Sequence, residues 1–172
     1  ILVKHAHSLF REIIAKAGLS DRLEGNQGNG EDFFGRIFPE TFVEAAYLVE
    51  PRTADVLVID EAQDLLTPAN IDAFDVLLRD GLRKGRWHMF LDPLQNIYGK
   101  ESEVAEGVLR EAGFAEYDLY ENCRNTRQVA LQTSIISGVD MAIEGAPDGP
   151  ECECSYYRNR EDLLEKLTRC VR

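Results

Sequence analysis

The sequence predicts an α/β protein in which a parallel, doubly wound sheet is flanked by helices and carries a small helical insert. Two observations support this prediction: apolar, β-branched runs end abruptly in charged residues, and helical periodicities alternate with those runs. The clearest run, residues 56–59, reads V-L-V-I and leads straight into Asp60. Continuous apolar residues without alternation are typical of a central strand buried on both faces of a parallel sheet.

The segments before this strand predict a short strand, a helix, a loop and the insert. Residues 1–3 are apolar and predict a buried strand, and the apolar residues of 9–17 fall on one helical face that ends at Gly18. Residues 20–31 are rich in glycine and asparagine, which predicts a flexible loop. Pro39 is well placed at a helix start, so we expect a small helical subdomain after the loop.

The segments after the central strand continue the alternation. Thr67 followed by Pro68 predicts a helix N-cap, and Thr126 and Asn159 are expected to cap two later helices. The remaining predicted elements are a strand at 87–91, a helix at 104–112, and short strands at 117–120 and 151–156. We divide the chain into the start of the core (1–19), the loop and insert (20–50), the main core segment (51–137) and a linker with a strand and helix (138–172).

Composition narrows the class of protein. The 172 residues, with 44% apolar and 29% charged residues, suit one globular domain or slightly more, and no apolar stretch is long enough to span a bilayer. The net charge of −12 has the wrong sign for a domain that binds nucleic acid mainly by neutralising phosphates. The four cysteines form no C-x-x-C pair, so we expect reduced thiols in a cytoplasmic protein, with zinc binding as a weaker alternative.

Polar residues that suit phosphoryl transfer follow the predicted strands. One strand ends in Asp60 and Glu61, the next ends in Asp92 with Gln95 three residues later, and a third leads to Arg124. Open α/β sheets bind ligands at the carboxyl ends of their strands, so these side chains are expected around one crevice. One carboxylate would hold Mg²⁺, another would orient the attacking water, and the amide and guanidinium would stabilise charge on the γ-phosphate.

The same residues carry a family resemblance. Residues 58–64 (V-I-D-E-A-Q-D) resemble motif II of superfamily 1 helicases of the UvrD/Rep type, residues 91–99 (L-D-P-L-Q-N-I-Y-G) resemble motif III, and residues 119–126 (L-Y-E-N-C-R-N-T) resemble motif IV. Residues 5–9 (H-A-H-S-L) are similar to the segment of these helicases that contacts single-stranded DNA. The motifs occur in the family's order, and the resemblance implies an incomplete RecA-like fold of the P-loop NTPase type.

The resemblance also implies roles for individual residues. Asp60, with Glu61 beside it, would hold Mg²⁺, and Glu61 would activate the attacking water. Gln95 would sense the γ-phosphate of ATP, and Arg124 would act as an arginine finger. Coupling between the nucleotide site and motif III would fall to three polar residues, Gln63, Asp64 and Asp92. Contact with single-stranded DNA, in which aromatic rings stack on bases, would fall to His7, Ser8 and Tyr98.

Departures from the family pattern limit what the chain would do by itself. No G-x-x-x-x-G-K-[ST] phosphate loop occurs in the sequence, and motifs V and VI are also absent. Cys123 stands where many relatives have a tyrosine that stacks on adenine. We therefore expect ATP hydrolysis only in a parent chain with the remaining helicase domains. The missing loop is explained either by an excised piece, which the start at Ile1 favours, or by natural loss.

Two other functions stay open on the sequence. A metal-dependent nuclease or phosphatase could use the acidic cluster of Asp60, Glu61, Asp64 and Asp92 directly on a phosphate ester, and it would need no phosphate loop. The nuclease or phosphatase hypothesis gives no role to Gln95 or to the N-C-R-N-T segment. A non-enzymatic module could instead present its acidic surface to a protein partner.

Overall fold

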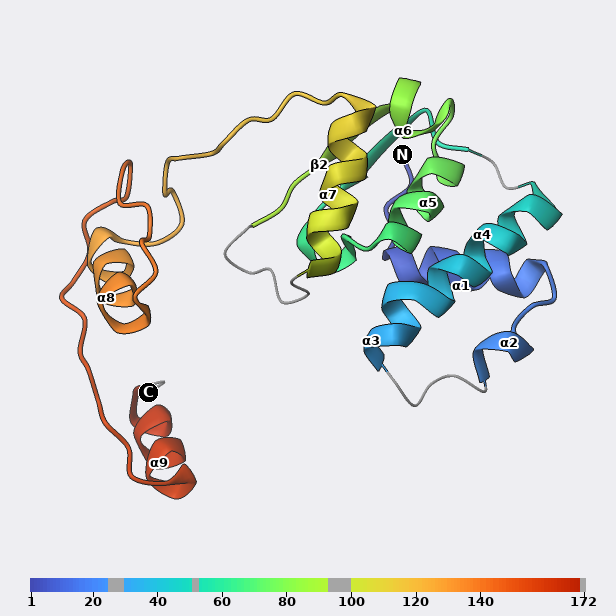
Figure 1. The fold of residues 1–172 in the computed structure, drawn as a ribbon. Helices are drawn as coiled ribbons and strands as arrows, with labels where there is room; N and C mark the ends of the chain where they lie inside the picture. Colours follow the sequence, from blue (N-terminus) through green and yellow to red (C-terminus); the bar gives the residue numbers. More distant parts are fainter. Residues whose placement is uncertain (25–29, 51–52, 93–99, 171–172) are drawn as a thin grey trace. The chain divides into compact units, whose positions relative to one another are not determined.

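The computed structural model describes residues 1–24, 30–50, 53–92 and 100–170. The backbone divides into two units, unit 1 (Ile1–Ala115) and unit 2 (Glu116–Arg172), which we describe separately (Figure 1). The division falls inside the segment 51–137. Asp60 and Glu61 therefore belong to unit 1, whereas Arg124 belongs to unit 2.

Unit 1 combines helices with a pair of strands. Its described elements, in chain order, are α1 (Ala6–Lys16), α2 (Asp21–Glu24), α3 (Gly30–Asp32), the π-helical turn η1 (Phe33–Ile37), α4 (Phe38–Val49), β1 (Val56–Ile59), the 3-10 turn η2 (Ala62–Leu65), α5 (Pro68–Leu77), α6 (Gly81–Lys84), β2 (Arg86–Met89) and α7 (Lys100–Ala112). The helix predicted after Pro39 is confirmed, with the proline in the first turn of α4. The prediction of a loop over residues 20–31 is wrong at both ends, because Asp21–Glu24 form α2 and Gly30 begins α3. The helix from residue 68 is confirmed too, and Thr67 Oγ1 accepts a hydrogen bond from Asn70 N at 3.3 Å.

An aromatic cluster forms the centre of the helical part of unit 1. Phe10 of α1 is 0% exposed and stacks on Phe42 of α4, with ring centroids 4.2 Å apart. Phe38 and Phe74 bring their rings to 6.0 and 6.5 Å from that of Phe10. The apolar face predicted for residues 9–17 therefore packs into this cluster. The predicted helix end is confirmed as well, because Gly18, just past α1, has a φ of +72°.

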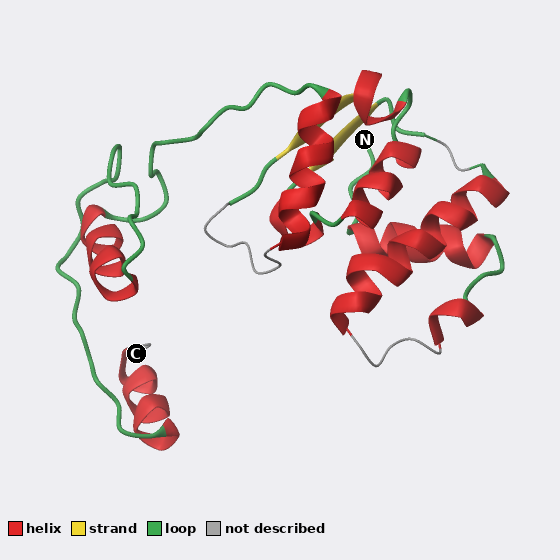
Figure 2. Cartoon of the chain, in the orientation of Figure 1, coloured by secondary structure: helices red, strands yellow, loops and turns green. Residues whose placement is uncertain are grey.

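The two strands pair in parallel, as the sequence predicts. Val56 lies opposite Arg86 and Ile59 lies opposite Met89, and α5 and α6 connect the strands. Figure 2 shows the two strands in yellow, and the α7 residues Ala105 and Leu109 are buried in the core cluster of unit 1. The prediction that the first strand is buried on both faces is wrong, because no described helix of unit 1 covers Val58, which is 61% exposed.

The other predicted strands are not formed in the described residues. Residues 1–3, 117–120 and 151–156 have no strand partner, and large apolar side chains there are exposed, as Leu119 is at 86%. An apolar or alternating run becomes a strand only where a neighbour supplies the backbone hydrogen bonds. The described chain is therefore a mixed helix and strand protein with a two-stranded parallel sheet, and the larger RecA-like sheet stays a prediction.

Unit 2 carries the helices α8 (Arg127–Ser137) and α9 (Arg160–Cys170). Both predicted N-caps are confirmed: Thr126 Oγ1 accepts from Val129 N at 3.4 Å, and Asn159 Oδ1 accepts from Asp162 N at 2.9 Å. The predicted linker after residue 137 begins at Gly138, which ends α8 with a φ of +72°.

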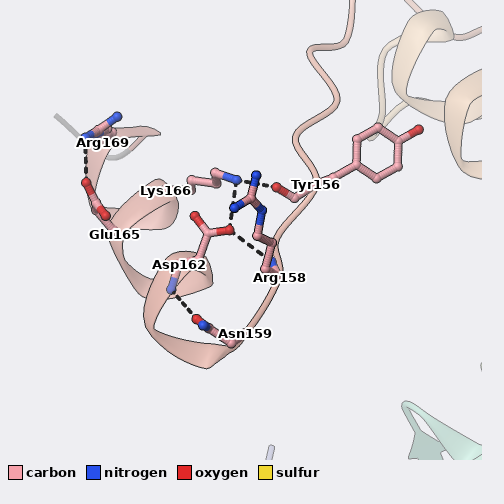
Figure 3. Close-up of polar contacts among 7 residues, drawn as sticks. All are labelled: Tyr156, Arg158, Asn159, Asp162, Glu165, Lys166 and Arg169. Atoms are coloured by element: carbon pink, nitrogen blue, oxygen red, sulfur yellow. Dashed lines mark hydrogen bonds and ion pairs between the residues drawn. The ribbon is translucent and has the colours of Figure 1, made fainter.

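Local polar contacts hold the first turns of α9, and none of its described side chains is buried (Figure 3). Asp162 Oδ2 accepts hydrogen bonds from Arg158 N at 2.9 Å and from Lys166 Nζ at 3.1 Å. Lys166 Nζ also donates to the backbone oxygen of Tyr156. These donors lower the pKa of the Asp162 carboxyl, the backbone hydrogen bond from Arg158 having the largest effect. A negative charge is thereby held at the positive end of the helix dipole.

Candidate functional site

The carboxyl ends of β1 and β2 stay joined beyond the strands themselves. Phe90 N donates to the oxygen of Ile59 at 2.9 Å, and Ala62 N donates to the oxygen of Phe90 at 2.8 Å. Asp60 and Glu61 lie between these two hydrogen bonds. Both acids thus stand at the edge of the parallel pair where open α/β sheets bind their ligands.

Glu61 has a backbone conformation that glutamate rarely adopts. Its φ and ψ of +52° and +43° lie in the left-handed helical region, which costs a residue with a Cβ roughly 1–2 kcal/mol. The turn is supported locally, because Glu61 N donates to Asp60 Oδ1 at 3.1 Å. Both acidic residues are exposed, so the turn presents two carboxylates to solvent. Strained residues of this kind gather at functional sites, where the surrounding structure maintains them.

Gln63 connects the acidic turn to the end of β2. Its Nε2 donates to Glu61 Oε2 at 2.7 Å, and its Oε1 accepts from Asp92 N at 3.1 Å. The Gln63 residue is only 2% exposed, and both of its hydrogen bonds are partly buried. One amide therefore fixes a Glu61 carboxylate oxygen relative to the strand that ends at Asp92.

The other predicted site residues do not all lie at this edge of the strands. Asp64 is exposed, and its backbone N donates to the oxygen of Glu61 at 3.1 Å. Gln95 and Tyr98 lie outside the described residues. Arg124 is exposed on a loop of unit 2. The structure thus brings Asp60, Glu61, Gln63 and the backbone of Asp92 together.

The acidic edge offers few ligands for a metal ion. No three His, Cys, Asp or Glu side chains among the described residues gather closely enough to hold a metal by themselves. Mg²⁺ commonly binds through one or two carboxylates, with water and substrate phosphate oxygens completing its octahedron. Asp60 and Glu61 are exposed oxygen donors of this chemical type.

His7 packs among aromatic rings at the start of α1. Its ring centroid lies 4.8 Å from that of Phe34 and 5.6 Å from that of Phe38, and its Nε2 is buried with no hydrogen-bond partner. Burial lowers the pKa of His7, and the charges of His5 and Arg11 lower it further. The half-buried ring is therefore part of the fold of unit 1, whereas Ser8 next to it is exposed.

Acid is expected to weaken unit 1 through His7. The pKa of His7 is lower in the folded chain than its ordinary value of 6.5, so the unfolded chain binds the proton more readily and stability falls as the pH drops below that value. Urea denaturation at about pH 5.5 and about pH 7.5 should show a smaller pH effect for His7→Gln than for the natural chain. The control is His88→Gln, at an exposed position of β2. Equal pH effects in His7→Gln and the natural chain would contradict this role.

Removing the Gln63 amide is expected to destabilise unit 1. Gln63→Met keeps the shape of the side chain but removes the oxygen that accepts from Asp92 N, and the loss of this partly buried hydrogen bond costs about 0.5–1.5 kcal/mol. Chemical denaturation followed by circular dichroism measures the loss. Gln132→Met in α8 is the matched control, because the Gln132 side chain makes no hydrogen bond in the described chain. A loss no larger than that of the control would show that the bridge contributes nothing.

Asn122 lies in the loop of unit 2 that carries Arg124, and the motif comparison supplied no role for it. Its Oδ1 accepts from Arg124 N at 3.2 Å and from Asn125 N at 3.0 Å, which closes the loop that bears Arg124. Asparagine commonly closes turns in this way, and an asparagine two residues before Arg124 was the available signal in the sequence.

Comparison with known proteins adds no assignment. No protein-family model matches the chain, and no curated protein or solved structure does. Among the described helices, none has the length and apolar character needed to cross a membrane. The arrangement at the ends of β1 and β2 is therefore the basis for a functional proposal.

Proposed function

We propose that this chain carries the magnesium-binding and water-activating half of the nucleotide site in an ATP-dependent DNA helicase or translocase similar to superfamily 1 motors. The observation that carries the proposal is the Gln63 bridge. It ties the carboxylate of Glu61, after β1, to the backbone of Asp92, after β2. A motor must transmit the state of the nucleotide to other parts of the protein, and this bridge supplies a direct connection between the two strand ends.

Each residue of the edge has a chemical task in this proposal. Asp60 would hold Mg²⁺, and the bound ion would supply positive charge against the phosphate oxygens. Glu61 Oε2 is held by Gln63, which leaves Oε1 to accept a proton from the attacking water. Gln95 and Arg124 stabilise charge on the transferred phosphoryl group, and Asp64 and Asp92 take part in coupling. The resemblance gives contact with single-stranded DNA to Ser8, Tyr98 and His7, and of these the described residue Ser8 is exposed.

The phosphate cradle has to come from other sequence. The 172 residues contain no G-x-x-x-x-G-K-[ST] loop, whose backbone N–H groups and lysine would bind the β- and γ-phosphates. The proposal therefore assigns hydrolysis to a longer protein that joins this chain to such a loop and to the remaining helicase domains.

The geometry of the acids weighs against the nuclease alternative. A nuclease that acts with two metal ions needs several carboxylates around the metals. Asp60, Glu61, Asp64 and Asp92 are all described, yet no metal-binding group of three acidic side chains forms among the described residues. The Gln63 bridge also ties up one oxygen of Glu61.

The test compares the 172-residue chain with the longer protein. The chain alone should neither hydrolyse ATP nor cleave DNA, whereas the longer protein should show ATP hydrolysis that single-stranded DNA stimulates. Phosphate release and cleavage of a labelled oligonucleotide with Mg²⁺ or Mn²⁺ are the measurements. DNA cleavage by the chain that Asp60→Asn abolishes would replace the proposal with the nuclease. A longer protein without ATPase activity that binds a protein partner independently of DNA would support the interaction module.

A further inference from the structure

The loop that carries Arg124 is fastened to a second segment of unit 2, residues 142–149. Asn122 makes the contacts at the start of the loop: its backbone N donates to the oxygen of Glu144 at 2.8 Å, and its Nδ2 donates to the oxygen of Ala142 at 2.9 Å. The same side chain accepts from Arg124 N and Asn125 N through Oδ1. One asparagine therefore closes the loop and anchors it to the second segment.

The far end of the loop is fastened to the same segment. Arg127 N donates to the oxygen of Pro147 at 2.9 Å, and Gly149 N donates to Gln128 Oε1 at 2.8 Å. A Cβ added at Gly149 would lie only 2.5 Å from Thr126 Cγ2, so the segment passes close to the cap of α8. Residues 122–128 are thus held at both ends.

Two neighbouring arginines of this loop differ in their ion pairing. The guanidinium of Arg127 pairs with Asp148 of the second segment, with Nε 3.5 Å from Oδ1. Arg124 is exposed, and no carboxylate of the described chain pairs with its guanidinium. Arg127 is engaged inside unit 2, whereas Arg124 extends from a fixed backbone with its charge available.

We propose that Asn122 is a positioning residue that holds the backbone of Arg124 so that its guanidinium meets a phosphoryl group. This inference rests on the proposed function, in which Arg124 stabilises charge in the transition state. A guanidinium on an ordered backbone loses less conformational entropy when it engages its target than one on a mobile loop. Loss of Asn122 should therefore lower kcat and leave the KM for ATP nearly unchanged, because the guanidinium acts mainly in the transition state.

The decisive variants separate the acceptor of Asn122 from its bulk. Asn122→Leu removes the two hydrogen bonds that Oδ1 accepts and the one that Nδ2 donates to Ala142 O, whereas Asn122→Asp keeps the Oδ1 acceptor and loses only the Nδ2 donor. In the 172-residue chain, hydrogen exchange at the amides of Arg124 and Asn125 should become about tenfold faster in Asn122→Leu and should increase less in Asn122→Asp. In the longer protein, kcat should fall about tenfold in Asn122→Leu, with the KM for ATP within about twofold, and should fall less in Asn122→Asp.

A pair of glycine variants tests the second segment without touching Asn122. Gly145 and Gly138 both have a φ of +72°, so alanine strains the backbone similarly at each. At Gly145 the new Cβ meets Glu121 Cβ at 3.2 Å, at the start of the arginine loop, whereas at Gly138 it meets nothing within 4 Å. Gly145→Ala should lower kcat more than Gly138→Ala does.

The outcomes distinguish this inference from the proposed function. If Arg124→Ala abolishes activity but Asn122→Leu keeps the natural kcat, the positioning role is wrong and the proposed function stands. Unchanged amide exchange in Asn122→Leu overturns the positioning role as well. If the longer protein lacks DNA-stimulated ATPase activity, or if Arg124→Ala leaves that activity intact, the role of Arg124 fails and the inference fails with it.

Discussion

Replacing Glu61 by glutamine is expected to lower DNA-stimulated ATP hydrolysis by at least about 100-fold in the longer protein, because glutamine cannot accept a proton from the attacking water. The substitution preserves the size of the side chain, and the glutamine oxygen can still accept from Gln63 Nε2 as the carboxylate does. Binding of ATP should therefore persist while turnover stops. Steady-state phosphate release at saturating DNA and equilibrium binding of a fluorescent ATP analogue measure the two effects.

The chain offers a closely matched control for this substitution. Glu50 ends α4 with a φ of +45°, so it is another exposed glutamate in the left-handed region. Glu50→Gln makes the same chemical change on a similar backbone, away from the strand ends, and should leave hydrolysis unchanged. If Glu61→Gln retains activity within a few-fold of the natural protein, Glu61 is not the base and the proposed mechanism is wrong.

Replacing Phe10 by alanine is expected to cause the largest loss of stability. Phe10 is 0% exposed and contacts three other rings, those of Phe38, Phe42 and Phe74. Deleting a buried phenyl ring removes its transfer free energy and leaves a cavity, which costs about 3–5 kcal/mol. That loss is comparable to the whole stability of many domains, so unit 1 should be largely unfolded at 37 °C or close to it. Urea denaturation followed by circular dichroism measures the change.

Tyr47→Ala in α4 is the control for the Phe10 substitution. Tyr47 is also aromatic and helical, but it is 73% exposed, so its removal should change the free energy of unfolding by only about 0.5 kcal/mol. A Phe10→Ala variant that loses no more stability than this control would mean that the aromatic cluster does not hold unit 1 together.

Local signals in the sequence were sufficient for the longer helices and for the pair of strands, but not for the short helices α2, α3 and α6. Thr67, Thr126 and Asn159 accept hydrogen bonds at the helix starts where capping chemistry predicts them. Three predicted strands are not formed in the described residues. A strand needs a neighbouring strand as a partner, and local sequence does not specify that partner. Residues 117–120, for example, carry exposed Tyr117 and Leu119 and pair with no described strand.

In the candidate site, too, local sequence predicted some features, whereas contacts between distant segments could not be predicted. The position of Asp60 and Glu61 at a strand end follows from the apolar run that precedes them. The hydrogen bond between Gln63 and Asp92 joins residues 29 positions apart in the sequence, and the one between Asn122 and Ala142 joins residues 20 positions apart. Such contacts depend on how separate segments register in space, which no local pattern encodes. The resemblance to helicase motifs suggested a coupling role for Gln63, but it gave no geometry.

Because of the left-handed backbone at Glu61, backbone strain and the proposed catalysis place opposite demands on the residue at position 61. Glycine would adopt the φ of +52° without the steric cost that a Cβ imposes, so Glu61→Gly should relieve strain in the turn. The same change would remove the carboxylate that the proposed chemistry requires. Glu61→Gly would also leave Gln63 Nε2 without its acceptor, so laboratory evolution for heat tolerance would favour glycine at position 61 only where the relief of strain exceeds that cost, whereas selection for turnover would retain glutamate. The residue found at this position in a set of evolved variants would report which of the two pressures had acted.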